Sequence, residues 1–378
     1  MPEIEPVPLA QLTTLRTGGV AEHMVEATTR DELVRVLREV WASGEPWLVI
    51  GGGSNLFIGD DPVPGTVIRV RTRGIQASPS PRPGHVRLTV EAGHDWDDLV
   101  RYAVAEGLAG IEAMSGIPGT VGAAPVQNIG AYGQEIVQTL VEVELLDEDT
   151  GELSVVSAAE LGLGFRTSVL KHHYGSEPER RAVIVSVTLD LEHVGGGDRA
   201  LPGEQLRTAL GVAPGASVSL GWVRDHVLAT RAAKGMVLDD ADPDTYSAGS
   251  FFQNAIVSES FARTLPAACP RWPLNPPVDP VTVIPLAAYD GYVPPPLVQN
   301  SDVKVSAAWL IEHSGLRRGF RLPHSRAALS GKHALALTNR GTATAAEIAE
   351  LARFIQGRVQ SEFGLILQPE PVLVGVEL

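Results

Sequence analysis

Residues 47–55 read WLVIGGGSN, an apolar run that stops at three consecutive glycines. The run Trp47–Ile50 has the length and apolar character of a buried strand. Glycine allows positive φ and close approach to a ligand, so the amides of Gly51, Gly52 and Gly53 are candidates for binding phosphate oxygens. Ser54 and Asn55 add side-chain donors. The dinucleotide fingerprint G-x-G-x-x-G is absent, so this stretch predicts either a tight turn between strands or a phosphate-binding turn.

The residues before this stretch predict a strand and a helix. His23–Ala27 reads as a short strand, and Thr29 and Glu32 form a capping-box pattern. An apolar helical face follows, made of Leu33, Val36, Leu37 and Val40. The segment is therefore predicted to be a β-α-β unit whose second strand ends at the glycine turn.

Later segments predict a largely antiparallel sheet and further helices. The strands expected in this sheet are Val141–Leu146, Ser154–Val156 and Ala182–Leu189. Further strand candidates are Val67–Val70, Arg87–Glu91 and Leu365–Leu367. The helix candidates are Asp95–Glu106, with Asp95 as its cap, Val218–Lys234, and a segment that begins at the capping box of Thr344 and Glu347 and ends at Gly364. Prolines remove backbone hydrogen-bond donors, so Pro266–Pro296 is predicted to be a loop or an insertion.

Composition limits the function classes. A chain of 378 residues is expected to form two or three domains. Its formal net charge of −15 argues against wrapping nucleic acid. Cys269 is the only cysteine, so no intrachain disulfide is possible, and no motif suggests a metal site. The first residues lack a signal-peptide pattern, and no apolar run reaches the length of a membrane span, so we expect a soluble cytoplasmic protein without membrane insertion.

A second glycine-rich stretch covers Ser115–Gly133. It contains GIPGTVG at 116–122 and QNIGAYG at 127–133, with few charges. Such a loop suits contact with a flat, large and partly apolar ligand, whereas a surface loop is ordinarily more polar. Two separate glycine-rich backbones predict a long ligand held at its pyrophosphate and again near its ring, which is what FAD requires.

Several polar residues are candidates for chemistry. Arg166, in GFRTS, is suited to bind a carboxylate or a developing enolate, although a solvated basic turn is the commoner fate of such a residue. Ser250, in AGSFFQN, is either a satisfied core serine or a positioned proton donor, and no G-x-S-x-G pattern supports a hydrolase. Glu370 lies between two prolines that restrict its backbone. Lys234 closes a helix, where it also complements the helix dipole.

In this order, the segments resemble the UDP-N-acetylenolpyruvoylglucosamine reductase (UDP-N-acetylmuramate dehydrogenase) family, in its long form with a substrate-covering loop. The resemblance runs from Leu15 nearly to the last residue. Its strongest blocks are Gly51–Asn55, Gly116–Gly133, Phe165–Lys171, Gly249–Asn254, Ala307–Glu312, Lys332–Leu335 and Phe363–Gly375. One departure is Pro202, which stands where the family's loop tyrosine is expected.

The resemblance implies an α+β fold: a vanillyl-alcohol-oxidase (PCMH)-type FAD-binding fold of two subdomains plus an α/β substrate-binding domain. The implied divisions are residues 1–75 and 76–230 for the FAD-binding subdomains, 231–368 for the substrate domain, and 369–378 for a C-terminal strand that returns to the active site. The implied FAD-binding residues are Gly51, Gly52, Gly53, Ser54, Asn55, Gly116, Ile117, Pro118, Gly119, Gly122, Asn128, Gly130 and Arg231.

The resemblance also implies the reaction. NADPH would reduce non-covalently bound FAD, and flavin N5 would then pass hydride to the enolpyruvyl ether of a UDP-sugar. Ser250 would be the proton donor, with Arg166 and Glu370 flanking the enolpyruvyl group, and substrate contacts would come from Tyr132, Lys234 and Asn254. A monomer is expected. Two alternatives stay open: a flavin oxidase of the same fold acting on an alcohol or phenol, and a nucleotide-binding module without activity.

Overall fold

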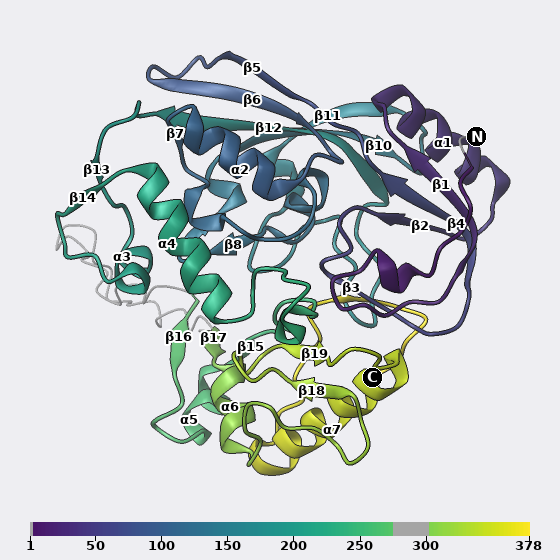
Figure 1. The fold of residues 1–378 in the computed structure, drawn as a ribbon, viewed down its shortest axis with the longest axis vertical. Helices are drawn as coiled ribbons and strands as arrows, with labels where there is room; N and C mark the ends of the chain where they lie inside the picture. The colour runs from purple at the N-terminus through teal and green to yellow at the C-terminus, as the bar shows by residue number, and fades with distance from the viewer. Residues whose placement is uncertain (1–2, 275–301) are drawn as a thin grey trace, which may run out of the picture.

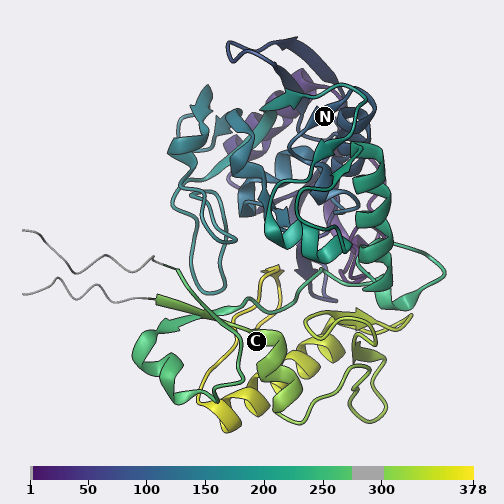
Figure 2. The same cartoon turned by 90° about the vertical axis from the view of Figure 1, so that its left-hand side faces the viewer.

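The computed structural model describes residues 3–274 and 302–378. Figure 2 shows two lobes, with the N-terminal chain (purple to teal) in the upper lobe and the C-terminal chain (green to yellow) in the lower lobe. The functional residues predicted above come from both lobes, so the way in which the chain passes between them determines the site.

The predicted β-α-β unit is confirmed. It consists of β1 (Ala21–Ala27), α1 (Arg30–Ser43) and β2 (Trp47–Ile50), and β4 (Val63–Val70) lies between the two strands and pairs in parallel with both. Thr29 and Glu32 form the reciprocal capping box at the start of α1, and Gly44 ends the helix in the left-handed conformation. The predicted apolar face of α1 is buried. The chain leaves β2 through the glycine turn and enters β3 (Leu56–Ile58).

The predicted antiparallel sheet is also confirmed. It has six strands, with β11-β10-β12-β6-β5 as its main path and β7 paired to β12. The bounds are β5 (Ile75–Pro79), β6 (His85–Glu91), β7 (Leu108–Ala109), β10 (Leu140–Asp147), β11 (Leu153–Ser157) and β12 (Ala182–His193). Helix α2 (Trp96–Ala105) starts at its predicted cap, where the Asp95 carboxylate accepts from two backbone amides. Figure 1 shows α2 lying beside this sheet.

Short elements lie between the strands of this sheet and along the path to the second lobe. The glycine-rich stretch is held by η2 (Glu112–Met114), η3 (Val121–Ala123), η4 (Pro125–Gln127), β8 (Gly130–Ala131), β9 (Gln134–Glu135) and η5 (Ile136–Gln138). The remaining short elements here are η1 (Leu9–Gln11), η6 (Ala158–Leu161), β13 (Arg199–Ala200), α3 (Glu204–Leu210), β14 (Ser217–Val218) and η7 (Pro243–Thr245). Helix α4 (Leu220–Ala233) begins two residues later than predicted, because Val218 pairs in β14 and Ser219 caps the helix.

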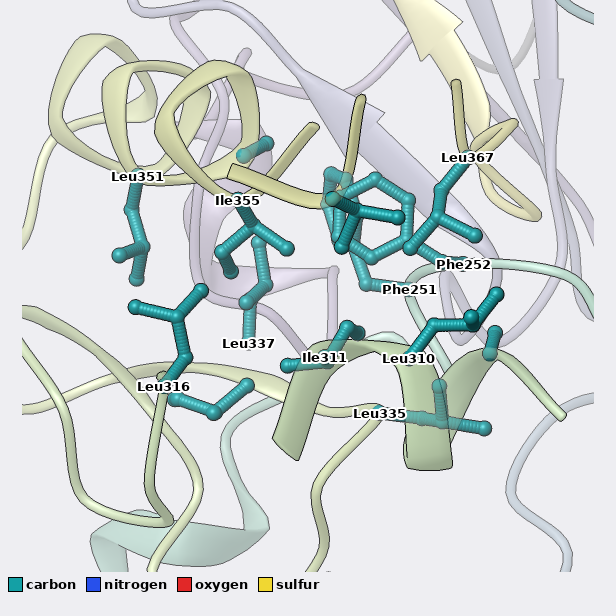
Figure 3. Packing of buried hydrophobic residues seen from close by; sticks show 14 of the residues in the cluster. Phe251, Phe252, Leu310, Ile311, Leu316, Leu335, Leu337, Leu351, Ile355 and Leu367 are labelled. Carbon is teal, nitrogen blue, oxygen red and sulfur yellow. The ribbon is translucent and has the colours of Figure 1, made fainter. Parts of the chain in front are cut away.

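The lower lobe is built around its own apolar core. Its elements are β15 (Ala255–Ser258), α5 (Glu259–Thr264), β16 (Arg271–Pro273), β17 (Asp302–Val305), α6 (Ala307–His313), β18 (Ala327–Leu329), β19 (Leu337–Asn339) and α7 (Ala345–Phe363). Figure 3 shows Leu351 and Ile355 of α7 facing Leu316, Leu337 and Ile311 in this core. The core also takes in Phe251 and Phe252, the residues that follow Ser250.

The last strand returns to the upper lobe. β20 (Val372–Val374) pairs in parallel with β3, so the segment around Glu370 is held beside the glycine turn. The predicted strand at Leu365–Leu367 was wrong: these residues form no strand, and Leu367 is buried in the lower core. The predicted loop at Pro266–Pro296 contains strand β16 in its described part, while residues 275–296 lie outside the described residues.

The domain divisions expected at residues 75, 230 and 368 stay a prediction. Within residues 3–274 and 302–378, no helix combines the length and apolar character that a membrane crossing requires.

Candidate active site

A large cavity lies where the glycine turn, the second glycine-rich stretch and the returning C-terminal segment meet. Its volume is about 1180 Å³, above the range of roughly 300–1,000 Å³ of drug-sized pockets. The predicted residues that line it are Gly51, Gly52, Gly53, Ser54, Asn55, Ile117, Pro118, Gly119, Gly122, Gly130, Arg166, Arg231, Ser250 and Glu370. The space is sufficient for a ligand of dinucleotide size.

The two glycine-rich stretches touch each other in the cavity wall. A Cβ atom built on Gly52 would lie 2.6 Å from the Gly119 Cα, and one on Gly53 would lie 2.1 Å from the Leu12 carbonyl oxygen. Gly53 also has a φ of +60°, which glycine adopts without a steric cost. Side chains are therefore excluded from this wall, and a ligand can approach the backbone directly.

Arg231 brings a buried positive charge to the same cavity. One of its Nη atoms donates to the Met236 carbonyl at 3.0 Å, while its buried Nε has no partner among the described residues. Burial lowers the pKa of this guanidinium. An unpaired buried donor costs free energy unless a ligand completes it. The bare glycine wall, the cavity volume and this donor together fit a large, partly anionic cofactor such as FAD.

Three ionisable groups form a cluster on the cavity wall, two from residues 165–171 and one from near the C-terminus. The Nε of Arg166 lies 3.3 Å from a carboxylate oxygen of Glu370, and the Lys171 Nζ donates to the Glu370 carbonyl oxygen at 3.1 Å and to the Gln127 side chain at 3.3 Å. Burial raises the pKa of Glu370 against the opposing charges of Arg166 and Lys171. Burial lowers the pKa of Lys171 to about 8, with Glu370 opposing the shift. The cluster carries more positive than negative charge when all three groups are ionised.

The backbone of Arg166 is strained, with a φ of +54° that is uncommon outside glycine. Its guanidinium donates to the carbonyls of Asn128 and Gly130 at 3.2 and 3.1 Å, which fixes the side chain against the second glycine-rich stretch. Strained residues of this kind concentrate at functional sites, where the surroundings hold them in place. Arg166 is therefore positioned before any ligand binds.

Ser250 is attached to two other segments of the site. The Phe251 amide donates to the Leu335 carbonyl at 2.7 Å, and the Glu370 amide donates to the Phe251 carbonyl at 2.9 Å. The Ser250 Oγ lies 3.5 Å from the Nε2 of His333. Burial and nearby cations lower the pKa of His333 to about 4, so this imidazole is neutral at physiological pH.

Comparison with known proteins agrees with this geometry. Residues 21–157 match the family model of an FAD binding domain, and residues 242–374 match that of the UDP-N-acetylenolpyruvoylglucosamine reductase C-terminal domain. The UDP-N-acetylenolpyruvoylglucosamine reductase of Leifsonia xyli subsp. xyli is 51% identical over 99% of this chain and 100% of its own length. That of Nocardia farcinica is 45% identical over 99% of this chain and 90% of its own length. The chain belongs to the UDP-N-acetylenolpyruvoylglucosamine reductase family.

A solved member of this family has the same fold. The crystal structure of UDP-N-acetylenolpyruvylglucosamine reductase from Thermus caldophilus aligns with a TM-score of 0.60 and 25% identity over 98% of both chains. The chain is therefore an FAD-binding oxidoreductase, and its predicted α+β fold class with an FAD-binding fold is confirmed.

Five predicted site residues do not line the cavity: Gly116, Asn128, Tyr132, Lys234 and Asn254. The buried Asn128 amide donates to Glu135 and to the Gly164 carbonyl, and the Asn254 side-chain oxygen accepts from the Ala307 amide at 3.0 Å. The Lys234 Nζ lies 5.6 Å from the centre of the Tyr132 ring. The ligand contacts assigned to all five stay predictions.

Two further residues at the site were not predicted from the sequence. Lys171 and His333 both belong to motif blocks that carry the family resemblance, yet neither was given a role. Their burial and their contacts to Glu370 and Ser250 come from segments far apart in the chain. The motif blocks were the available signal, because a lysine or histidine beside small residues is otherwise typical of an exposed loop.

Proposed function

We propose that this chain reduces UDP-N-acetylglucosamine enolpyruvate to UDP-N-acetylmuramate, a reaction of peptidoglycan precursor synthesis, with NADPH as the reductant. The observation that carries the proposal is that three candidate catalytic residues meet in one cavity. Ser250, Arg166 and Glu370 come from separate segments, and all three line the cavity that the two glycine-rich stretches also line. Binding alone does not require a proton donor, a carboxylate-binding arginine and a buried glutamate in one place.

The glycine walls and Arg231 would hold FAD. Bound FAD would supply a hydride to the carbon–carbon double bond of the enol ether. The sequence contains no dinucleotide fingerprint that would mark a separate NADPH site, which supports one cavity that NADPH and the sugar nucleotide occupy in turn.

Arg166 and Lys171 would prepare the site for the pyruvyl carboxylate. Their two positive charges face the single carboxylate of Glu370, which leaves a net attraction for a second carboxylate. As negative charge spreads onto the pyruvyl group during reduction, the Arg166 guanidinium offsets it. Loss of one such donor costs on the order of 10²–10³ in rate.

Ser250 would complete the reduction by donating its hydroxyl proton to the carbon next to the one that receives hydride. General-acid catalysis of this kind contributes roughly 10²–10⁴ in rate. The adjacent Phe251 and Phe252 are fully buried, so the backbone of Ser250 is fixed by the apolar core next to it. Glu370 would orient the intermediate from the opposite side of the cluster.

The test separates the two halves of the reaction. In anaerobic stopped-flow experiments, Ser250→Ala should keep flavin bleaching by NADPH and lose flavin reoxidation by the enolpyruvyl sugar nucleotide. Ser260→Ala, an exposed serine on α5, is the matched control and should leave both halves unchanged. Equal loss of both halves in Ser250→Ala would contradict the proton-donor role.

The same material tests the alternative functions. A chain that binds FAD but never bleaches with NADPH would be a nucleotide-binding module. Yellow colour that stays on the protein after acid precipitation would indicate a covalent flavin and favour an oxidase.

A further inference from the structure

We propose that His333 is a positioning residue that donates its Nε2–H to the Ser250 hydroxyl and thereby turns the serine proton toward the cavity. The inference rests on the proposed role of Ser250 as the proton donor. A hydroxyl that accepts a hydrogen bond from the protein can donate its own hydrogen to the substrate. A hydroxyl that instead donates to a histidine is activated as a nucleophile, because the histidine acts as its base.

A backbone hydrogen bond between their two segments holds the side chains of Ser250 and His333 near each other. The Ser250 Oγ and His333 Nε2 lie 3.5 Å apart, a long hydrogen bond of the kind that tightens when substrate binds. One residue after Ser250 and two residues after His333, the Phe251 amide donates to the Leu335 carbonyl at 2.7 Å. Figure 3 shows Phe251 and Leu335 in the lower-lobe core, so the segments that carry Ser250 and His333 are anchored in the same core.

The loop that carries His333 is held from several sides. The fully buried Ser330 hydroxyl accepts from the amides of Lys332 and His333 at 3.1 and 3.2 Å. The Gly331 amide donates to Asp244 at 2.9 Å, and the Lys332 Nζ pairs with Asp242 at 2.5 Å. These contacts hold His333 in place before any ligand binds.

The charges around His333 favour the donor role. Burial lowers the pKa of His333, and the positive charges of Lys234, Arg318 and Arg231 lower it further, so the imidazole is neutral. A neutral ring carries one proton, and these cations also stabilise the negative charge that remains on the Ser250 oxygen after it has given up its proton. Water returns that proton before the next turnover, so the histidine ends each cycle unchanged.

The experiment compares two replacements of similar size in the full-length, flavin-loaded protein. His333→Gln keeps an N–H donor, and His333→Met removes it. We expect flavin reoxidation by the enolpyruvyl sugar nucleotide to slow roughly 10- to 100-fold in His333→Met, the range found when the hydrogen-bond partner of a metal-site ligand is removed. His333→Gln should recover most of the rate. Flavin bleaching by NADPH should be unchanged in both variants, which also shows that they fold and bind FAD.

A double mutant distinguishes this inference from the proposed function. If His333 acts through Ser250, His333→Met should cost nothing further in a Ser250→Ala background. Equal rates for the Gln and Met variants would overturn the donor role, as would a full additional loss in the double mutant. If Ser250→Ala itself reoxidises normally, the proposed function of Ser250 fails; if it collapses while His333→Met is normal, only the present inference fails.

Discussion

Replacing Gly52 by alanine tests whether the two glycine-rich stretches form one cofactor-binding wall. Among the glycines of the first stretch, Gly52 isolates the effect of close approach, because its φ lies outside the left-handed region. The added Cβ would lie 2.6 Å from the Gly119 Cα and 3.1 Å from its carbonyl carbon. Both contacts are to backbone, so no side-chain rotation relieves them.

The magnitude follows from this overlap. Forcing an extra methyl group into a packed wall costs typically ~1–3 kcal/mol. If the wall yields by separating the two stretches, the cost falls on FAD binding. Since each 1.4 kcal/mol is a factor of ten in Kd, FAD affinity should fall roughly 5- to 140-fold.

The assay is titration of the flavin-free protein with FAD, followed by flavin fluorescence, together with thermal unfolding of the same material. Gly357→Ala is the control, because this glycine lies within α7 and its Cβ would meet nothing within 4 Å. That variant should gain roughly 0.5–1 kcal/mol of stability and bind FAD normally. An unchanged FAD affinity together with an unchanged unfolding midpoint in Gly52→Ala would refute the close packing of the two stretches.

Three further outcomes are expected. Arg224→Met should destabilise the protein by about 1.5–3 kcal/mol in urea unfolding, because the partly exposed Asp97 carboxylate loses two contacts of 2.7 and 2.6 Å and keeps the one to the Gly116 amide. Thr344→Ala should cost ~1 kcal/mol in the same assay by removing the cap of α7, whereas Thr344→Ser should cost little. Burial lowers the pKa of His333 from its ordinary 6.5 to about 4, so the unfolded chain binds more protons between these pH values and stability should fall as pH drops through that window. The loss should reach ~3 kcal/mol near pH 4 and be absent in His333→Gln, and a pH profile shared by both proteins would contradict the neutral, buried state of His333.

Local signals in the sequence were enough for much of the secondary structure. The capping boxes at Thr29 and Thr344 and the cap at Asp95 were predicted correctly because each depends on residues within one helical turn. The β-α-β unit followed from short-range apolar spacing. The prediction at Leu365–Leu367 was wrong for the same reason: three apolar residues after a helix resemble a strand locally. In the structure Leu365 and Leu367 pack in the lower-lobe core, while Ile366 is exposed.

The glycines, Arg166, Ser250 and Glu370 were recognisable from their motifs, since their residue types and order survive in the linear chain. The environment of these residues in the folded chain could not be predicted from the motifs. Lys171 lies 199 residues from Glu370 in the chain, and their contact exists only because β20 returns to pair with β3. Burial then shifts the pKa values of Lys171, Glu370 and His333, and burial is a property of packing that no local stretch contains. Residue identity thus supplied the reactive groups, while long-range strand pairing and desolvation determined which of them meet and in which charge state.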